Sequence, residues 1–274
     1  MAAMSIPEMD VASSSSGTTG AAKALVKGLA LVELVAAAPE PVRLTDLVDA
    51  GALPRSTTLR LLAALVEAGV LETRPDRCYS LGPQLAVWGQ QYLERLDVAQ
   101  KAGDLMRGVA DAARETCFLG VREHRQVLYV ACADGPQAVR PVARVGSRNP
   151  LHCTGIGKAL LAFALPELVA EYTEGELERR TERTITEPAA LLEELERTRE
   201  RGWAIDDVEN EEGVRCIAAP IRDHLGAVVA AMSVAAPAYR FALEDLDDLA
   251  PTVLNATAEL SRRIGWRAPA EEAT

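Results

Sequence analysis

The sequence RLTDLVDAGALPRSTTLRLLAALVEAGVLETRPDRCYSL, residues 43–81, decides the fold of the first part of the chain. It predicts a short helix over 44–51, capped by Thr45 and ended by Gly51, because threonine accepts hydrogen bonds from first-turn amides. Pro54 suits the first turn of a second helix, which Gly69 ends. Two short strands, 70–73 and 77–81, follow around a Pro-Asp turn. Helix, sharp turn, helix and hairpin is the order of a winged helix-turn-helix, a DNA-binding module.

The second helix of this stretch has two different faces. At about 100° per residue, its apolar face is predicted to hold Leu59, Leu62 and Val66. The leading turns present polar and small residues on the other side: Arg55, Ser56, Thr57, Arg60 and Ala64. Arginine and hydroxyl groups bond base edges and phosphates, and the first turns of a recognition helix enter the major groove. An ordinary amphipathic helix in a helical domain is the alternative, and Arg74 and Arg77 in the hairpin favour DNA.

Composition predicts a folded chain without membrane spans. The 274 residues, 49% of them hydrophobic, are enough for two domains with cores of their own. No apolar run approaches the ~20 residues of a membrane span, and no secretion signal is visible at the N-terminus. Five cysteines without a C-x-x-C pair favour a reducing, cytoplasmic location over a disulfide framework.

The net charge of −11 argues against simple electrostatic attraction to DNA. Residues 20–82 carry seven basic and seven acidic side chains, so this region is neutral and the remainder is acidic. Specific DNA binding would therefore depend on a few placed arginines, doubled by dimerisation.

The rest of the chain predicts an α/β domain, which makes the whole protein α+β. We expect a disordered arm over 1–20, the winged module over 21–82, a linker helix over 83–98, a sensor domain over 99–267 and a loose tail over 268–274. The helix over 21–38 is predicted to have an apolar face of Leu25, Leu29, Val32 and Val35 or Ala36. The sensor elements are expected as helices over 103–116, 158–165, 166–172, 189–201 and 243–264, and as strands over 117–121, 126–131, 139–145, 203–206, 213–221 and 227–237.

Several long motifs in order resemble the IclR-type bacterial transcriptional regulators over about residues 21–267. The matching pieces are LPRSTTLRLLAALVEAGVLE (53–72), YSLGPQL (79–85), RVGSRNPLHCTGIGKALLA (144–162), RGWAIDDVENEEGVRCIAAPIRDHLGAVVAAMSV (201–234) and SRRIGW (261–266). The resemblance implies a winged helix, a linker helix and a GAF-like effector-binding domain. It also implies a dimer or tetramer, more often a repressor, that binds operator DNA under control of a small molecule. Thr45, Arg74, Arg77 and Tyr79 would then hold phosphates or a groove edge beside the recognition helix.

The glycine loop 154–157 offers backbone N–H groups at a helix N-terminus, which suits a carboxylate. A tight loop that merely needs glycine is the alternative, and the spacing is not that of a P-loop. By resemblance, the effector, an organic or aromatic acid, would contact Thr154, Gly155, Ile156, Asp206, Cys216 and Ser233. Ala235 stands where some acid-binding relatives carry a second serine, which leaves a larger or more apolar ligand equally open.

Three other functions are compatible with single features. Cys216 could be the nucleophile of a hydrolase, although no nucleophile motif surrounds it. His152 and Cys153 could share a metal, but no metal-ligand spacing is present, so no metal and no cofactor are predicted. A sensor that does not bind DNA would use the helix-turn-helix as a dimer contact. The sequence favours a regulator without enzyme activity.

Overall fold

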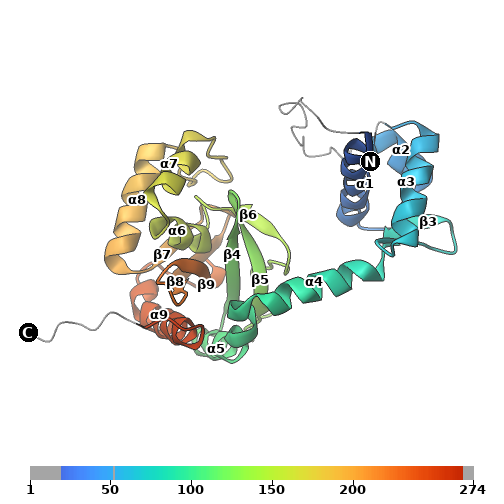
Figure 1. The fold of residues 1–274 in the computed structure, drawn as a ribbon. Coiled ribbons are helices and arrows are strands. Elements are labelled where there is room, and N and C mark those ends of the chain that lie inside the picture. The colour runs from blue at the N-terminus through green and yellow to red at the C-terminus, as the bar shows by residue number, and fades with distance from the viewer. Residues whose placement is uncertain (1–19, 52, 268–274) are drawn as a thin grey trace, which may run out of the picture. The chain divides into compact units, whose positions relative to one another are not determined.

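The computed structural model describes residues 20–51 and 53–267, which form two units, one ending at Tyr92 and the next beginning at Leu93 (Figure 1). Each unit is described by itself. The predicted arm over 1–20, except for Gly20, and the tail over 268–274 lie outside the described residues.

The N-terminal unit has the predicted three helices and hairpin in the predicted order, with one additional strand between the first two helices. It contains helices α1 (Gly20–Ala37), α2 (Leu44–Gly51) and α3 (Arg55–Glu67) and strands β1 (Val42–Arg43), β2 (Leu71–Thr73) and β3 (Cys78–Leu81). The strands form an antiparallel sheet in the order β1-β3-β2. Gly69 ends α3 with φ +69°, where a side chain would be strained. Helix α4 (Pro83–Arg95) begins directly after β3.

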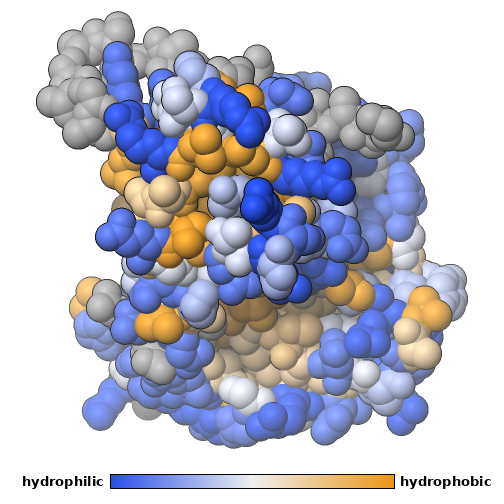
Figure 2. Space-filling view, turned by 90° about the vertical axis from the view of Figure 1, so that its right-hand side faces the viewer, coloured by the Kyte–Doolittle hydropathy of each residue, from blue (hydrophilic) through white to orange (hydrophobic). Residues whose placement is uncertain are grey.

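The buried faces of α1 and α3 differ from the prediction. Leu25 and Leu29 are 65% and 53% exposed, whereas the core contains Leu31 and Leu34 of α1 together with the predicted Val35. In α3, Leu59 is 41% exposed, and the buried face is centred on Thr58 and Leu62. A polar residue can occupy this face because the Thr58 hydroxyl donates to the Pro54 carbonyl at 3.3 Å. Figure 2 shows apolar side chains on the outside of this unit.

Strand β1 was not predicted, and its presence moves the start of α2. Val42 and Arg43 pair with Tyr79 and Cys78 of β3, so the chain is extended until α2 begins at Leu44. Thr45 therefore lies inside the first turn, where its hydroxyl donates to Asp46 at 3.3 Å, and the prediction that Thr45 caps this helix was wrong.

The C-terminal unit is a six-stranded antiparallel sheet between two layers of helices (Figure 1). Its strands are β4 (Thr116–Glu123), β5 (Gln126–Ala133), β6 (Arg148–Pro150), β7 (Ala204–Asp207), β8 (Val214–Arg222) and β9 (Val228–Pro237), in the order β6-β5-β4-β9-β8-β7. Helices α5 (Asp97–Ala113) and α9 (Asp245–Arg263) cover one face, and α6 (Gly155–Ala162), α7 (Pro166–Glu174) and α8 (Pro188–Arg201) lie on the other. Strands β8 and β9 are apolar on both faces because two separate cores enclose them.

The predicted strand over 139–145 is absent. Pro141 has no N–H to pair, and the chain instead turns back at Gly146, whose φ is +90° and whose N–H donates to the Tyr129 carbonyl at 2.8 Å. The edge strand β6 follows this turn and pairs with β5. Two helices also begin earlier than predicted, α5 at Asp97 rather than 103 and α6 at Gly155 rather than 158.

Candidate functional site

Helix α3 presents its leading turn at the surface of the N-terminal unit. Arg55, Ser56 and Arg60 are exposed and Thr57 is half-buried. These polar residues therefore lie on the side of α3 away from its buried face, as predicted. That buried face is centred on Thr58 and Leu62. Arg60 and its neighbours therefore lie at the surface of this unit.

The hairpin between β2 and β3 carries the other predicted DNA contacts. Arg74 is exposed and forms an ion pair with Glu72 at 3.6 Å, and Arg77 is exposed in the tight turn with φ 61°. Asp76 accepts the Cys78 N–H at 3.2 Å, which lowers the pKa of its carboxyl and holds the turn. Tyr79 is half-buried against the core, so its ring is a support for the hairpin.

The effector residues named by resemblance meet in one pocket of the C-terminal unit. The pocket is lined by all six predicted residues, together with Phe118, Tyr129, Pro141, Val142, Ala143, Asn149, Asn210, Glu211, Val214 and Ala235. One wall is the N-terminus of α6, and the opposite wall is the sheet.

The N-terminus of α6 is held close to the sheet. Thr154 caps the helix: its hydroxyl accepts from the Gly157 N–H at 3.1 Å and donates to the Pro150 carbonyl at 2.9 Å. A Cβ on Gly155 would lie 2.8 Å from Cys216 Sγ, and one on Gly157 would lie 2.1 Å from the Leu151 carbonyl oxygen. Both glycines are therefore required by close approach, and the Thr154 hydroxyl serves mainly to hold the loop.

Strand register arranges the sheet wall in rows. Asp206 pairs with Cys216, and Cys216 pairs with Ala235, so these three side chains form a row across β7, β8 and β9. In the next row Ser233 lies beside Phe118 of β4. Directly paired residues share one face of a sheet, which explains why residues from distant parts of the sequence line the same pocket.

Asp206 is an acidic group of the pocket wall and is almost completely buried. Its Oδ1 accepts N–H groups of Glu209 at 2.7 Å and Asn210 at 3.4 Å, and its Oδ2 lies 4.0 Å from Cys216 Sγ. Burial, reinforced by the charge of Glu209, raises the pKa of Asp206 to about 7, against the opposing effect of Lys158. Near neutral pH this carboxyl can therefore exchange a proton when a charged ligand arrives.

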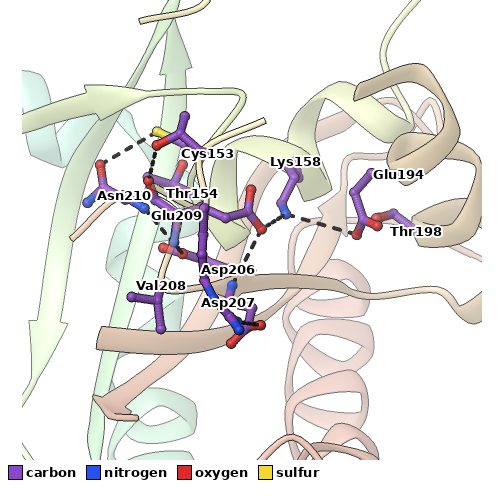
Figure 3. Close-up of polar contacts among 12 residues, drawn as sticks. Cys153, Thr154, Lys158, Glu194, Thr198, Asp206, Asp207, Val208, Glu209 and Asn210 are labelled. Carbon is purple, nitrogen blue, oxygen red and sulfur yellow. Dashed lines mark hydrogen bonds and ion pairs between the residues drawn. The ribbon is translucent and has the colours of Figure 1, made fainter. Parts of the chain in front are cut away.

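A buried lysine lies behind Asp206 (Figure 3). Lys158 of α6 is fully buried, forms an ion pair with Glu209 and lies 4.0 Å from Glu194 of α8. Glu194 is also bound by Arg201 at 2.7 Å. This charge chain joins α6, the loop after β7 and α8, because a buried charge needs partners.

His152 and Cys153 do not form a metal site within the described ranges. The two ring nitrogens of His152 lie 3.0 Å from the Tyr172 hydroxyl and 3.0 Å from the Glu178 carbonyl, and burial lowers the pKa of the ring. Cys153 Sγ faces Asn210 at 3.7 Å. No group of three or more potential metal ligands occurs among residues 20–51 and 53–267.

Sequence reasoning missed the aromatic and loop side chains of the pocket. Phe118 and Tyr129 pack edge to face at 5.7 Å on neighbouring strands, and Asn149 donates to the Tyr129 hydroxyl at 3.4 Å. The polar tips of Tyr129 and Asn149 beside apolar strands were the available signal. Pro141–Ala143 could not be found, because they were assigned to a strand.

A helix-turn-helix unit with an exposed recognition helix, followed by a unit with a ligand pocket, defines a DNA-binding transcriptional regulator. The family model for the bacterial transcriptional regulator IclR C-terminal matches residues 90–262, and that for the IclR helix-turn-helix domain matches residues 24–75. The chain belongs to the IclR family of bacterial transcriptional regulators.

Individual relatives agree along most of the chain. It is 35% identical to the HTH-type transcriptional regulator BhcR of Paracoccus denitrificans, covering 93% of this chain and 91% of that protein, and 35% identical to KdgR of Escherichia coli, covering 82% and 86%. Among solved structures, an IclR homologue from Microbacterium hydrocarbonoxydans complexed with 4-hydroxybenzoate has a TM-score of 0.79 at 29% identity, with 88% of this chain and 98% of that chain covered.

None of the helices within the described ranges has both the length and the apolar character that crossing a membrane requires.

Proposed function

We propose that this regulator is a repressor whose hold on operator DNA changes when a small carboxylic acid occupies the pocket beside α6. The observation that carries this proposal is the meeting of all six predicted effector residues in one pocket, against a helix N-terminus that favours an anion. A related structure with bound 4-hydroxybenzoate supports an aromatic or organic acid as the ligand class. The acid acts by binding one arrangement of the protein better than another.

In this proposal α3 contacts bases and the hairpin contacts phosphates. Arg55, Ser56, Thr57 and Arg60 enter the major groove, while Thr45, Arg74, Arg77 and Tyr79 border the backbone. Residues 20–82 carry equal numbers of basic and acidic side chains, so affinity depends on these few contacts. Replacing Arg60 with alanine is expected to weaken operator binding by ~1–3 kcal/mol if its guanidinium contacts a base.

DNase footprinting on upstream DNA tests this role of α3. Arg107, an exposed arginine of α5, provides the matched control, since Arg107→Ala removes the same charge from the other unit. A folded Arg60→Ala variant with wild-type affinity would remove Arg60 from the interface. No protection by the wild-type protein at low salt would favour a sensor that does not bind DNA.

We also propose that two copies associate through the N-terminal unit. Leu25 and Leu29 of α1 and Val87, Trp88 and Tyr92 of α4 are large apolar side chains that remain exposed in a single chain. A dimer would contact half-sites about one helical turn, ~10 bp, or a multiple apart. Sedimentation analysis of Trp88→Glu tests this: an unchanged dimer would exclude α4 from the contact.

We assign no catalytic role to Cys216. Burial strongly raises the pKa of its thiol, and its polar neighbours are the Asp206 carboxyl and the Gly155 N–H. A nucleophilic thiol needs a base or a lowered pKa. Ester hydrolysis that is present in the wild type and lost in Cys216→Ser would contradict this assignment.

A further inference from the structure

Every strand of the six-stranded sheet contributes a residue to the pocket beside α6. Asp206 and Cys216 come from β7 and β8, at one edge of the sheet, and Tyr129 and Asn149 come from β5 and β6, at the other. All four side chains line the pocket. A ligand in this pocket can therefore contact polar groups from both edges of the sheet.

Tyr129 is held in the pocket wall from two sides. Its hydroxyl oxygen accepts a hydrogen bond from Asn149 Nδ2 at 3.4 Å, and its ring packs edge to face against Phe118, with 5.7 Å between the ring centroids. Only 8% of Tyr129 is exposed. Both of these neighbours line the pocket as well, so the phenol group is fixed within the wall.

The hydroxyl proton of Tyr129 is available to a ligand. The bond from Asn149 uses a lone pair of the oxygen, and no residue in the described part of the chain accepts the proton. Burial raises the pKa of Tyr129, and the charges of Cys216 and Asp206 in the same pocket wall raise it further, against the effect of the Asn149 bond. The phenol therefore keeps its proton at neutral pH and is a hydrogen-bond donor.

The first turn of α6 connects the two ends of the pocket. A Cβ on Gly155 would lie 2.8 Å from Cys216 Sγ of β8, and a Cβ on Gly120 of β4 would lie 3.0 Å from Cγ2 of Ile156. Gly120 is the direct strand partner of Tyr129. A small acid with its carboxylate at Gly155 can therefore extend along Ile156 toward Tyr129.

We propose that Tyr129 is the hydrogen-bond donor for the distal end of the effector, which is therefore an acid with a carbonyl or hydroxyl oxygen remote from its carboxylate. This inference rests on the proposed binding of an acid at the N-terminus of α6. Asn149 is a positioning residue, because it binds the phenol oxygen and leaves the proton for the ligand. An acid with an apolar far end buries this proton without an acceptor, which is unfavourable.

Isothermal titration of the full-length protein with matched pairs of acids tests the proposal. The pairs are pentanoate with 4-oxopentanoate, butyrate with 4-hydroxybutyrate, and benzoate with 4-hydroxybenzoate. The wild type is expected to bind the oxygenated member of at least one pair about tenfold more tightly, the effect of one hydrogen bond to a buried group. The first pair is the most specific for a donor in the protein, because a ketone oxygen accepts hydrogen bonds and cannot donate them.

Four variants locate the source of the preference. Tyr129→Phe removes the hydroxyl, keeps the ring against Phe118, and should reduce the preference to less than about threefold without weakening the unsubstituted acid. Asn149→Ala, which releases the phenol, should reduce it to an intermediate value. Tyr239→Phe is the matched control, since it removes the same atom from a residue that is 78% exposed and outside the pocket. Ser233→Ala removes another hydroxyl of the wall and should keep the preference, whatever its effect on the affinity common to both acids.

The possible outcomes separate this inference from the proposed function. Thermal unfolding without ligand shows whether each variant is folded. If acids bind but the wild type shows no preference within any pair, or if folded Tyr129→Phe keeps the preference, Tyr129 is not the distal donor. Loss of the preference in Ser233→Ala alone would assign the contact to Ser233 instead. If none of the acids binds the wild type, the proposed acid pocket itself is wrong, and this inference fails with it.

Discussion

Replacing Asp206 with asparagine should stabilise the C-terminal unit above neutral pH. The folded state raises the pKa of Asp206 from 3.8 to about 7, because burial disfavours its charged form. Each tenfold change in proton affinity corresponds to about 1.4 kcal/mol, so the ionised Asp206 costs the folded state up to about 4 kcal/mol at pH 8. Asparagine mimics the neutral acid and keeps an oxygen for the Glu209 and Asn210 N–H groups.

The sign follows from proton binding. Between pH 4 and 7 the folded state holds a proton on Asp206 that the unfolded chain has released, so this carboxyl makes stability fall as pH rises. Its destabilising effect is absent below pH 4 and complete above pH 7. The wild type and Asp206→Asn should therefore differ little at pH 4 and most at pH 8.

Hydrogen exchange of the β8 and β9 amides provides the assay, since it reports opening of this unit separately from the N-terminal one. Asp111→Asn, at an exposed position of α5, is the matched control and should leave the exchange free energy unchanged. If the β8 and β9 amides of Asp206→Asn exchange as fast as those of the wild type at pH 8, or faster, the ionised carboxyl does not destabilise the folded state.

Three further changes have expected outcomes. The affinity for any acid that binds beside Asp206 should fall about tenfold from pH 6 to pH 8, because two adjacent negative charges disfavour each other. Titration calorimetry should show a weaker dependence of this affinity on pH for Asp206→Asn. In urea unfolding, Leu62→Ala should destabilise the N-terminal unit by about 2–5 kcal/mol. Leu59 is half-exposed, so Leu59→Ala should cost less than about 1 kcal/mol. Equal effects would contradict the observed buried face of α3. In thermal unfolding, Gly157→Ala should lower the stability of the C-terminal unit by about 3 kcal/mol, because its Cβ would meet the Leu151 backbone. Gly89 has open space around it, so Gly89→Ala should stabilise α4 by ~0.5–1 kcal/mol.

The order of elements in the N-terminal unit could be predicted because its turn residues are local signals. Gly51, Pro54 and Gly69 mark boundaries that lie within a residue or two of the observed ones. The buried face of each helix was harder to predict. Leu25 and Leu59 are apolar yet exposed, and Thr58 is polar yet buried, because partner helices and one backbone carbonyl decide which side is covered.

The pocket could be predicted only in part, because register is not a local property. Cys216 and Ser233 were named by resemblance to the family, and their positions within apolar strands are compatible with a few polar atoms lining a pocket. Phe118 joins Ser233 in the same wall only because β4 pairs with β9, which lies more than a hundred residues away along the chain. The segment 139–145 was misassigned because its three valines, at 139, 142 and 145, favour a strand, although Pro141 prevents regular pairing.

The enclosed amine of Lys158 makes it a built-in reporter for opening of the C-terminal unit. The chain has only four lysines, at positions 23, 27, 101 and 158, and the first three are exposed or half-buried. An amine-reactive label should therefore modify those three quickly and Lys158 only when α6 separates from Glu209. The slow labelling rate of this one side chain would follow breathing of the domain in solution, and its further slowing by an acid would mark ligands that bind beside α6.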